Sequence, residues 1–117
     1  MRDHLFIGST PADEDCAQVG QPNYRREALA ECRAFIAAIK KKLGPPPENA
    51  ELAIKACPHD FGTYHEVVCY YEDTDRKSLD YALKCESDAP ATWAEVGWTR
   101  EQVLKGDIHE NDSTVRS

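Results

Sequence analysis

The stretch CPHDFGTYHEVVCYY, residues 57–71, gathers the densest set of reactive side chains in the chain. Cysteines, histidines and acidic residues alternate there with aromatic and apolar ones. Thiolates, imidazoles and carboxylates are the common protein ligands of zinc and the common partners in nucleophilic catalysis. The stretch therefore raises the question of whether the fold brings these groups to one point.

A zinc site is not expected from this stretch, because the spacing Cys-x-His-x5-His-x3-Cys is unusual for zinc ligands. The stretch also has the pattern of a β-hairpin. If Lys55 pairs with Glu66 as an opposite-charge pair across the strands, Cys69 enters the core and Cys57 points to the other face beside Tyr64. A register shifted by one residue would leave Cys69 about 13 Å from the residue opposite Cys57. We therefore expect no metal and no other cofactor.

The turn of this hairpin supports a smaller catalytic hypothesis. His59 and Asp60 would lie at the turn, with Cys57 and His65 near the same end. A cysteine–histidine pair can form a reactive thiolate, and a histidine–aspartate pair can orient an imidazole. The structural alternative, which we favour, is an ordinary turn in which Asp60 hydrogen-bonds local backbone and Gly62 supplies the positive φ.

Cys16 is the remaining candidate nucleophile, in the polar segment 12–23 that shows no helical or strand periodicity. Three acidic residues precede it, and neighbouring anions raise the pKa of a thiol. These acids also lack the spacing of a calcium-binding loop. A small cysteine- and histidine-dependent enzyme or metal protein would require Cys16, His59, Asp60 and His65 to meet around one pocket.

The periodicity of apolar residues predicts one α+β domain over residues 1–106, followed by a polar, disordered tail at 107–117. The predicted elements, in chain order, are a strand at 4–8, a helix at 24–43, strands at 51–57 and 63–72, a helix at about 75–86 and short helices near 88–93 and 99–105.

This order is β-α-β-β-α with short C-terminal helices. The third strand either inserts between the first two or leaves them adjacent. We favour a three-stranded, mostly antiparallel sheet with both long helices on one face, a partial ferredoxin-like arrangement.

Aromatic residues suggest a binding surface. Tyr64 and Tyr70 would share the sheet face opposite the helices, and Trp93 and Trp98 follow in the C-terminal segment. Tyrosine and tryptophan are frequent anchors of protein interfaces. Either the C-terminal segment covers this sheet face, or these aromatic residues form an exposed binding site.

The charge of the chain bears on its partners. The net charge is −7, and residues 66–112 carry twelve acidic and five basic residues. An acidic surface disfavours direct nucleic-acid binding and permits binding to a basic protein, although it also serves solubility alone. A homodimer formed through an edge strand or the open sheet face is a further alternative.

The cellular setting follows from what the sequence lacks. It contains no apolar run long enough to span a membrane and no recognisable secretion signal. Its five cysteines are an odd number, which disfavours a disulfide framework. We therefore expect a cytoplasmic protein with free thiols.

Three stretches carry a resemblance to a known family: CAQVG at 16–20, PHDFGTYHEVVCYY at 58–71 and KCESDAPATW at 84–93. Together they resemble an uncharacterised family of small bacterial proteins found on phages, plasmids and integrated elements. The resemblance implies a bacterial setting and a role in conflict between such an element and its host. With the charge and the aromatic residues, we expect a non-enzymatic protein-binding module, in one form an acidic inhibitor of a host protein.

Overall fold

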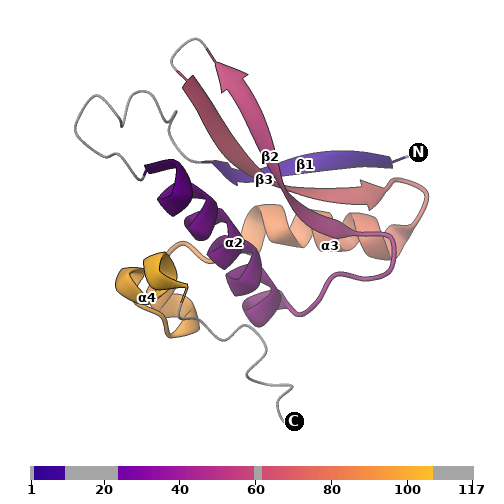
Figure 1. Cartoon of the computed structure of the whole chain (residues 1–117). Coiled ribbons are helices and arrows are strands. Elements are labelled where there is room, and N and C mark those ends of the chain that lie inside the picture. Colours follow the sequence, from indigo (N-terminus) through magenta and orange to yellow (C-terminus); the bar gives the residue numbers. More distant parts are fainter. Residues whose placement is uncertain (1, 10–23, 60–61, 107–117) are drawn as a thin grey trace.

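The computed structural model describes residues 2–9, 24–59 and 62–106 (Figure 1). Its elements, in chain order, are β1 (Arg2–Ser9), α2 (Tyr24–Leu43), β2 (Glu51–His59), β3 (Gly62–Glu72), α3 (Arg76–Asp88), the 3₁₀ helix η1 (Trp93–Val96) and α4 (Arg100–Lys105). The predicted β-α-β-β-α order and the short helix at 99–105 are confirmed, but the helix predicted near 88–93 is wrong, because α3 runs to Asp88 and the next helical turn, η1, begins at Trp93. Predictions for the segment around Cys16, for Asp60 and for the 107–117 tail fall outside the described residues.

The three strands form one antiparallel sheet in the order β1-β3-β2, so the third strand inserts between the first two. Lys55 lies opposite Glu66, as the opposite-charge pairing predicts. The strands of the hairpin are longer than expected, because Pro58 pairs with Thr63 and only residues 60–61 separate β2 from β3. Proline fits there because β2 is an edge strand, with a neighbour on one side only.

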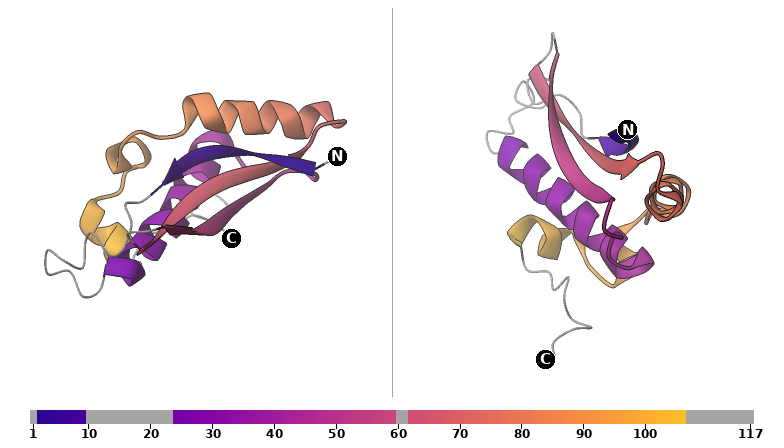
Figure 2. Two further views of the ribbon diagram at one scale, coloured as in Figure 1. Left: turned by 90° about the horizontal axis from the view of Figure 1, so that it is seen from above. Right: turned by 90° about the vertical axis from the view of Figure 1, so that its right-hand side faces the viewer.

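Helices α2 and α3 both pack against one face of the sheet, as predicted. Both lie on the lower side of the strands in Figure 1, and the strands lie in front of α2 in the left view of Figure 2. The strands contribute alternate residues to this main core, and each helix contributes one stripe. Its best-buried members are Cys32, Ile39, Val67, Cys69, Tyr71, Tyr81, Ala82 and Cys85.

A second core lies on the other side of α2, away from the sheet. Three alanines of α2 form its base, and their small side chains let the C-terminal segment approach the helix closely. The buried members are Ala34, Ala37, Ala38, Val96, Trp98 and Val103. Figure 1 shows α4 beside α2 on the side away from the strands. Of the elements that the structure describes, none covers the second face of the sheet.

The junction between β3 and α3 depends on local hydrogen bonds. Asp75 caps α3 by accepting from the Lys77 N–H at 3.3 Å, although Asp73 and Thr74, two and one residues earlier, are also residue types that cap helices. Asp75 is the cap because its N–H bonds the Glu72 carbonyl at 2.9 Å, which closes a turn after β3. Ser78, fully buried in the first turn of α3, binds the backbone of the same turn.

Candidate functional site

The hairpin register separates the candidate catalytic thiol from its candidate base. Cys57 lies opposite Tyr64, and His65 lies opposite Ala56. Because successive residues of a strand point to opposite faces, Cys57 is on the open face and His65 is on the face covered by helices. His65 is 6 % exposed. The predicted Cys57–His65 pair therefore cannot form a thiolate–imidazolium site.

The other members of the catalytic hypothesis cannot be assigned to a site. Cys16, Asp60 and the side chain of His59 lie outside the described residues. Within the described ranges, no three histidine, cysteine, aspartate or glutamate residues lie together as metal ligands would. The hypothesis that Cys16, His59, Asp60 and His65 meet around one pocket therefore stays a prediction.

The open-face cysteine has a tyrosine as its cross-strand neighbour. The Cys57 thiol lies 3.7 Å from the Lys55 carbonyl oxygen, to which it donates. The negative charge that Cys57 can carry, with burial and the nearby Glu66, raises the pKa of the Tyr64 hydroxyl above its ordinary value. Tyr64 is therefore protonated at neutral pH and cannot serve as a base.

Two further cysteines form a buried pair in the main core. Cys69 from β3 and Cys85 from α3 are both completely buried, and Tyr81 lies beside them. The hydrogen bond with Cys85 and the burial of the thiol raise the pKa of Cys69. Burial likewise raises the pKa of Tyr81, whose hydroxyl donates to the Gly44 carbonyl at 2.8 Å. Cys69 and Tyr81 therefore remain protonated at neutral pH, whereas the hydrogen bond with Cys69 lowers the pKa of Cys85. All three side chains pack in the main core.

On the open face an apolar row crosses all three strands, but Val68 at its middle is completely buried, so Phe6 is its exposed member. Phe6 of β1 is half exposed, at 50 %, and lies opposite Val68 of β3, which in turn lies opposite Ala53 of β2. Tyr64 and Tyr70 point to this face, in agreement with the alternation read from the sequence. Phe6, by contrast, was not among the candidate binding residues, because the continuous apolar run Leu5-Phe6-Ile7 does not show which face each side chain takes.

One end of the open face combines an aromatic ring with charges. The Arg2 guanidinium lies 4.6 Å from the centre of the Tyr70 ring and 2.5 Å from the Glu51 carboxylate. The His4 ring lies 5.4 Å from the Tyr70 ring, measured between ring centres. A hollow of about 400 Å³ beside this group is lined by residues that include Arg2, Glu48, Glu51 and Glu72. This end of the face is therefore acidic, and Arg2 of the chain itself binds there to Glu51 and the Tyr70 ring.

The two tryptophans lie far from the open sheet face. Trp98 is 7 % exposed in the second core, with the Lys41 ammonium 5.6 Å above its ring. Trp93 lies 6.4 Å from Trp98, measured between ring centres, and is only partly buried. The alternative in which the C-terminal segment covers the open sheet face is wrong for its described residues, because they pack on α2. The sequence did not reveal this because the alanines that receive the tryptophans form a weak apolar stripe.

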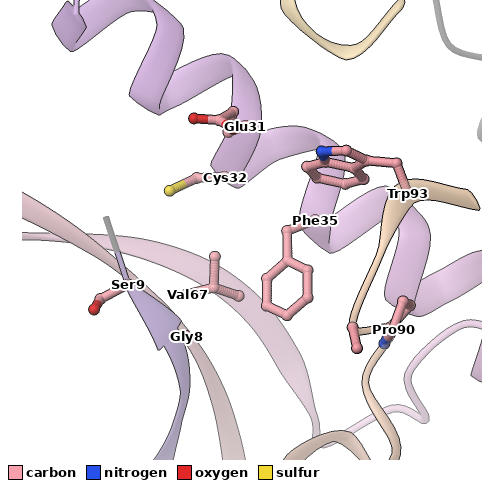
Figure 3. Close-up of a pocket in the computed structure, with 9 residues that line it drawn as sticks. Gly8, Ser9, Glu31, Cys32, Phe35, Val67, Pro90 and Trp93 are labelled. Atoms are coloured by element: carbon pink, nitrogen blue, oxygen red, sulfur yellow. The ribbon is translucent and has the colours of Figure 1, made fainter. Parts of the chain in front are cut away.

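A hollow that sequence analysis did not find lies between α2, the end of β1 and the segment joining α3 to η1 (Figure 3). Its volume is about 410 Å³. The residues around it are Gly8, Ser9, Glu31, Cys32, Phe35, Val67, Pro90, Ala91 and Trp93. They come from separate parts of the chain, so no local motif marks them.

Hydrogen bonds hold one wall of this hollow in place. The Glu95 carboxylate accepts from the N–H groups of Ala91 at 2.7 Å and Thr92 at 3.0 Å, and it binds the Lys42 ammonium at 3.0 Å. These bonds lower the pKa of Glu95, with the Lys42 bond making the largest contribution. The segment before η1 is thereby fastened to the end of α2.

Comparisons with known proteins assign no family to the chain. No family model matches the sequence, and no similar protein was found among curated proteins or among solved structures. In the ranges that the structure covers, no helix has the length and apolar character needed to cross a membrane. The functional argument therefore depends on the geometry of the chain itself.

Proposed function

We propose that the chain is a non-enzymatic protein-binding module that uses the open face of its sheet. The observation that carries this proposal is the half-exposed Phe6 beside Val68 and Tyr70, on a sheet face that no described element covers. Phe6 lies on the edge strand β1, and a large exposed aromatic side chain is a frequent anchor of a protein interface. The register keeps the candidate catalytic residues Cys57 and His65 apart, which favours binding over catalysis.

The charge favours a basic partner. The chain carries a net charge of −7, and the Tyr70 end of the open face has a hollow lined by Glu48, Glu51 and Glu72. An arginine or lysine from a partner would bind these carboxylates and the face of Tyr70, where Arg2 now lies. Nucleic acid is disfavoured as a direct ligand because its phosphates would meet this acidic surface.

The resemblance to proteins of bacterial mobile elements extends the proposal to a biological role. An acidic surface can occupy the basic site with which a host protein binds nucleic acid. In this form the chain acts as an inhibitor in the cytoplasm of a bacterial host. A homodimer through the same face is the competing arrangement, since the face would then be occupied by a second copy.

Site-specific photo-cross-linking tests the proposal. A photo-reactive phenylalanine analogue replaces Phe6 in one variant and Leu83 in a second, and each is produced in the cells that naturally express the chain. Leu83 is a matched control because it is 46 % exposed but lies on α3, away from the open face. We expect a cross-link to a basic protein from position 6 and none from position 83.

The strength of binding is then measured with the captured partner. Phe6→Ser should weaken binding about thirtyfold, as expected for an aromatic anchor worth about 2 kcal/mol, whereas Leu83→Ser should leave it unchanged. Binding should also weaken as the salt concentration rises. A cross-link only to a second copy of the chain, or equal loss of binding in both variants, would contradict the proposal.

A further inference from the structure

The hollow beside α2 has the size and composition of a small-molecule site. Its volume of about 410 Å³ falls in the range of about 300–1,000 Å³ typical of ligand pockets. A second hollow, also of about 410 Å³, shares Phe35, Pro90, Ala91 and Trp93 with it, so the two adjoin. The site is separate from the open sheet face, so the inference does not depend on the proposed function.

Two aromatic rings give this hollow an apolar lining that is only partly buried. Phe35 projects from α2 and Trp93 from η1, with Val67 of β3 and Pro90 completing the apolar walls (Figure 3). A ligand with a flat aromatic or branched hydrocarbon body would cover the exposed parts of these rings. Removal of such apolar surface from water is the main source of affinity in pockets of this kind.

The approach of Phe35 to β1 explains a glycine in that strand. A Cβ atom added to Gly8 would lie 3.2 Å from Cε2 of Phe35, closer than ordinary van der Waals contact. The absence of a side chain at Gly8 therefore lets the ring lie against the backbone of β1. With the segment before η1 held by Glu95, two walls of the hollow are in place before any ligand binds. A preformed site loses less entropy when it is occupied.

A single carboxylate defines the polar side of the hollow. The side chain of Glu31 is 25 % exposed, and the guanidinium of Arg100 lies 2.6 Å from its Oε2. A carboxylate has about four positions for hydrogen-bond donors, so Glu31 can accept from a ligand while it keeps Arg100. An ammonium group is the complementary partner. The aromatic faces and the net charge of −7 also favour a cation.

We propose that this hollow binds a small apolar amine, with its hydrocarbon body between Phe35 and Trp93 and its ammonium on Glu31. The binding is reversible and non-covalent. Cys32 is 3 % exposed, and its burial, with the nearby Glu31, raises the pKa of the thiol to about 11. At neutral pH the thiol is protonated and does not attack the ligand.

A series of three probes of similar shape tests the charge preference. They are 2-phenylethylamine, which is cationic, 2-phenylethanol, which is neutral, and phenylacetate, which is anionic. Titrations are followed by nuclear magnetic resonance of backbone and tryptophan N–H groups, with Trp98 as an internal reference for Trp93. We expect the amine to bind with a dissociation constant of about 1 mM and about five times more tightly than the alcohol, with the anion weakest.

Two variants and one control assign the binding to the hollow. Glu31→Gln should abolish the preference for the amine over the alcohol but keep the weaker binding of both. Glu101→Gln, which removes the same charge from an exposed position of α4, should leave the preference unchanged. Ala91→Phe should fill the hollow and abolish binding of all three probes, and Ala91 is exposed enough for the chain to keep its fold.

Each result decides the proposal. An amine site would be established if the amine shifts the resonances of residues around the hollow, if Ala91→Phe abolishes these shifts, and if Glu31→Gln removes the preference for the amine over the alcohol. Equal or tighter binding of phenylacetate, an equal effect of Glu31→Gln and Glu101→Gln, or no shift of these residues at about ten times the expected dissociation constant would overturn it.

Discussion

Replacement of Ser78 by alanine should destabilise the chain far more than loss of one surface hydroxyl. Ser78 is completely buried where β3 turns into α3. Its hydroxyl oxygen accepts from the Glu72 N–H at 3.0 Å. Its single proton is donated either to the Glu72 carbonyl at 2.9 Å or to the Asp75 carbonyl at 3.0 Å. One side chain thus binds both ends of the turn that joins the central strand to its covering helix.

The magnitude follows from these contacts. Ser78 makes one accepted and one donated hydrogen bond at a time, each with a net value of about 1 kcal/mol. Because removal of the hydroxyl leaves buried backbone groups without this partner, the combined cost rises to about 2.5 kcal/mol, within the range of about 1–3 kcal/mol for unsatisfied buried groups. Alanine regains about 0.5 kcal/mol because it has the higher helix propensity. We therefore expect Ser78→Ala to lower the free energy of unfolding by about 2 kcal/mol.

Denaturant unfolding of two variants measures this value. Ser87→Ala is the matched control, since Ser87 lies in the same helix but is exposed and donates only to the Leu83 carbonyl, at 3.1 Å. Its free energy of unfolding should stay within about 0.5 kcal/mol of the wild type. In thermal unfolding, Ser78→Ala should lower Tm by about 8 °C. Equal stability of the two variants would refute the inference that the Ser78 hydrogen bonds stabilise the β3–α3 turn.

Two other predictions concern protonation and thiol exposure. The folded-state pKa of Glu95 lies below its ordinary value of 4.5, so its stabilising effect is complete above pH 4.5 and is lost as the pH falls through the lower folded value. The difference in unfolding free energy between the wild type and Glu95→Gln should therefore shrink in acid, and a difference that grows in acid would contradict the Lys42–Glu95 contact. In a Cys16→Ser background, a thiol reagent should modify the partly exposed Cys57 first, and Cys57→Ser should remove this fast phase. The three slow thiols are Cys32, Cys69 and Cys85; their rapid modification in native protein would show that the main core opens.

Residue patterns in the sequence predict the sheet well. Alternation in 51–57 and 63–72, with the Lys55–Glu66 charge pair, predicts the hairpin register found in the structure. The register alone then separates Cys57 from His65. The position of β1 was less certain, because a short apolar strand can pair with either neighbour. Contacts of the strands with both helices decide that β1 pairs with β3 rather than with β2. No local sequence pattern contains these contacts.

The tryptophans and the hollow show what local patterns do not contain. Trp93 and Trp98 were expected either on the open sheet face or over it, and they pack on the outer side of α2 instead. A stripe of alanines is compatible with solvent, with a helix or with a sheet, so it does not identify its partner. The hollow is less accessible still to sequence analysis, because it requires Glu31, Phe35 and Trp93 to meet from elements far apart in the chain.

The insertion of β3 between β1 and β2 affects how the chain is made as well as how it folds. Of the three strands that the structure describes, β1 is synthesised first and its partner β3 last, so Leu5 can pair with Cys69 only after β3 has left the ribosome. Through most of translation β1 has no strand to pair with, and the hairpin must form before the sheet can be completed. Pairing over such a separation slows folding and leaves an apolar strand available to other chains. Synthesis of many copies close together therefore favours aggregation through β1, and slower initiation of translation or a chaperone that holds residues 2–9 would reduce it.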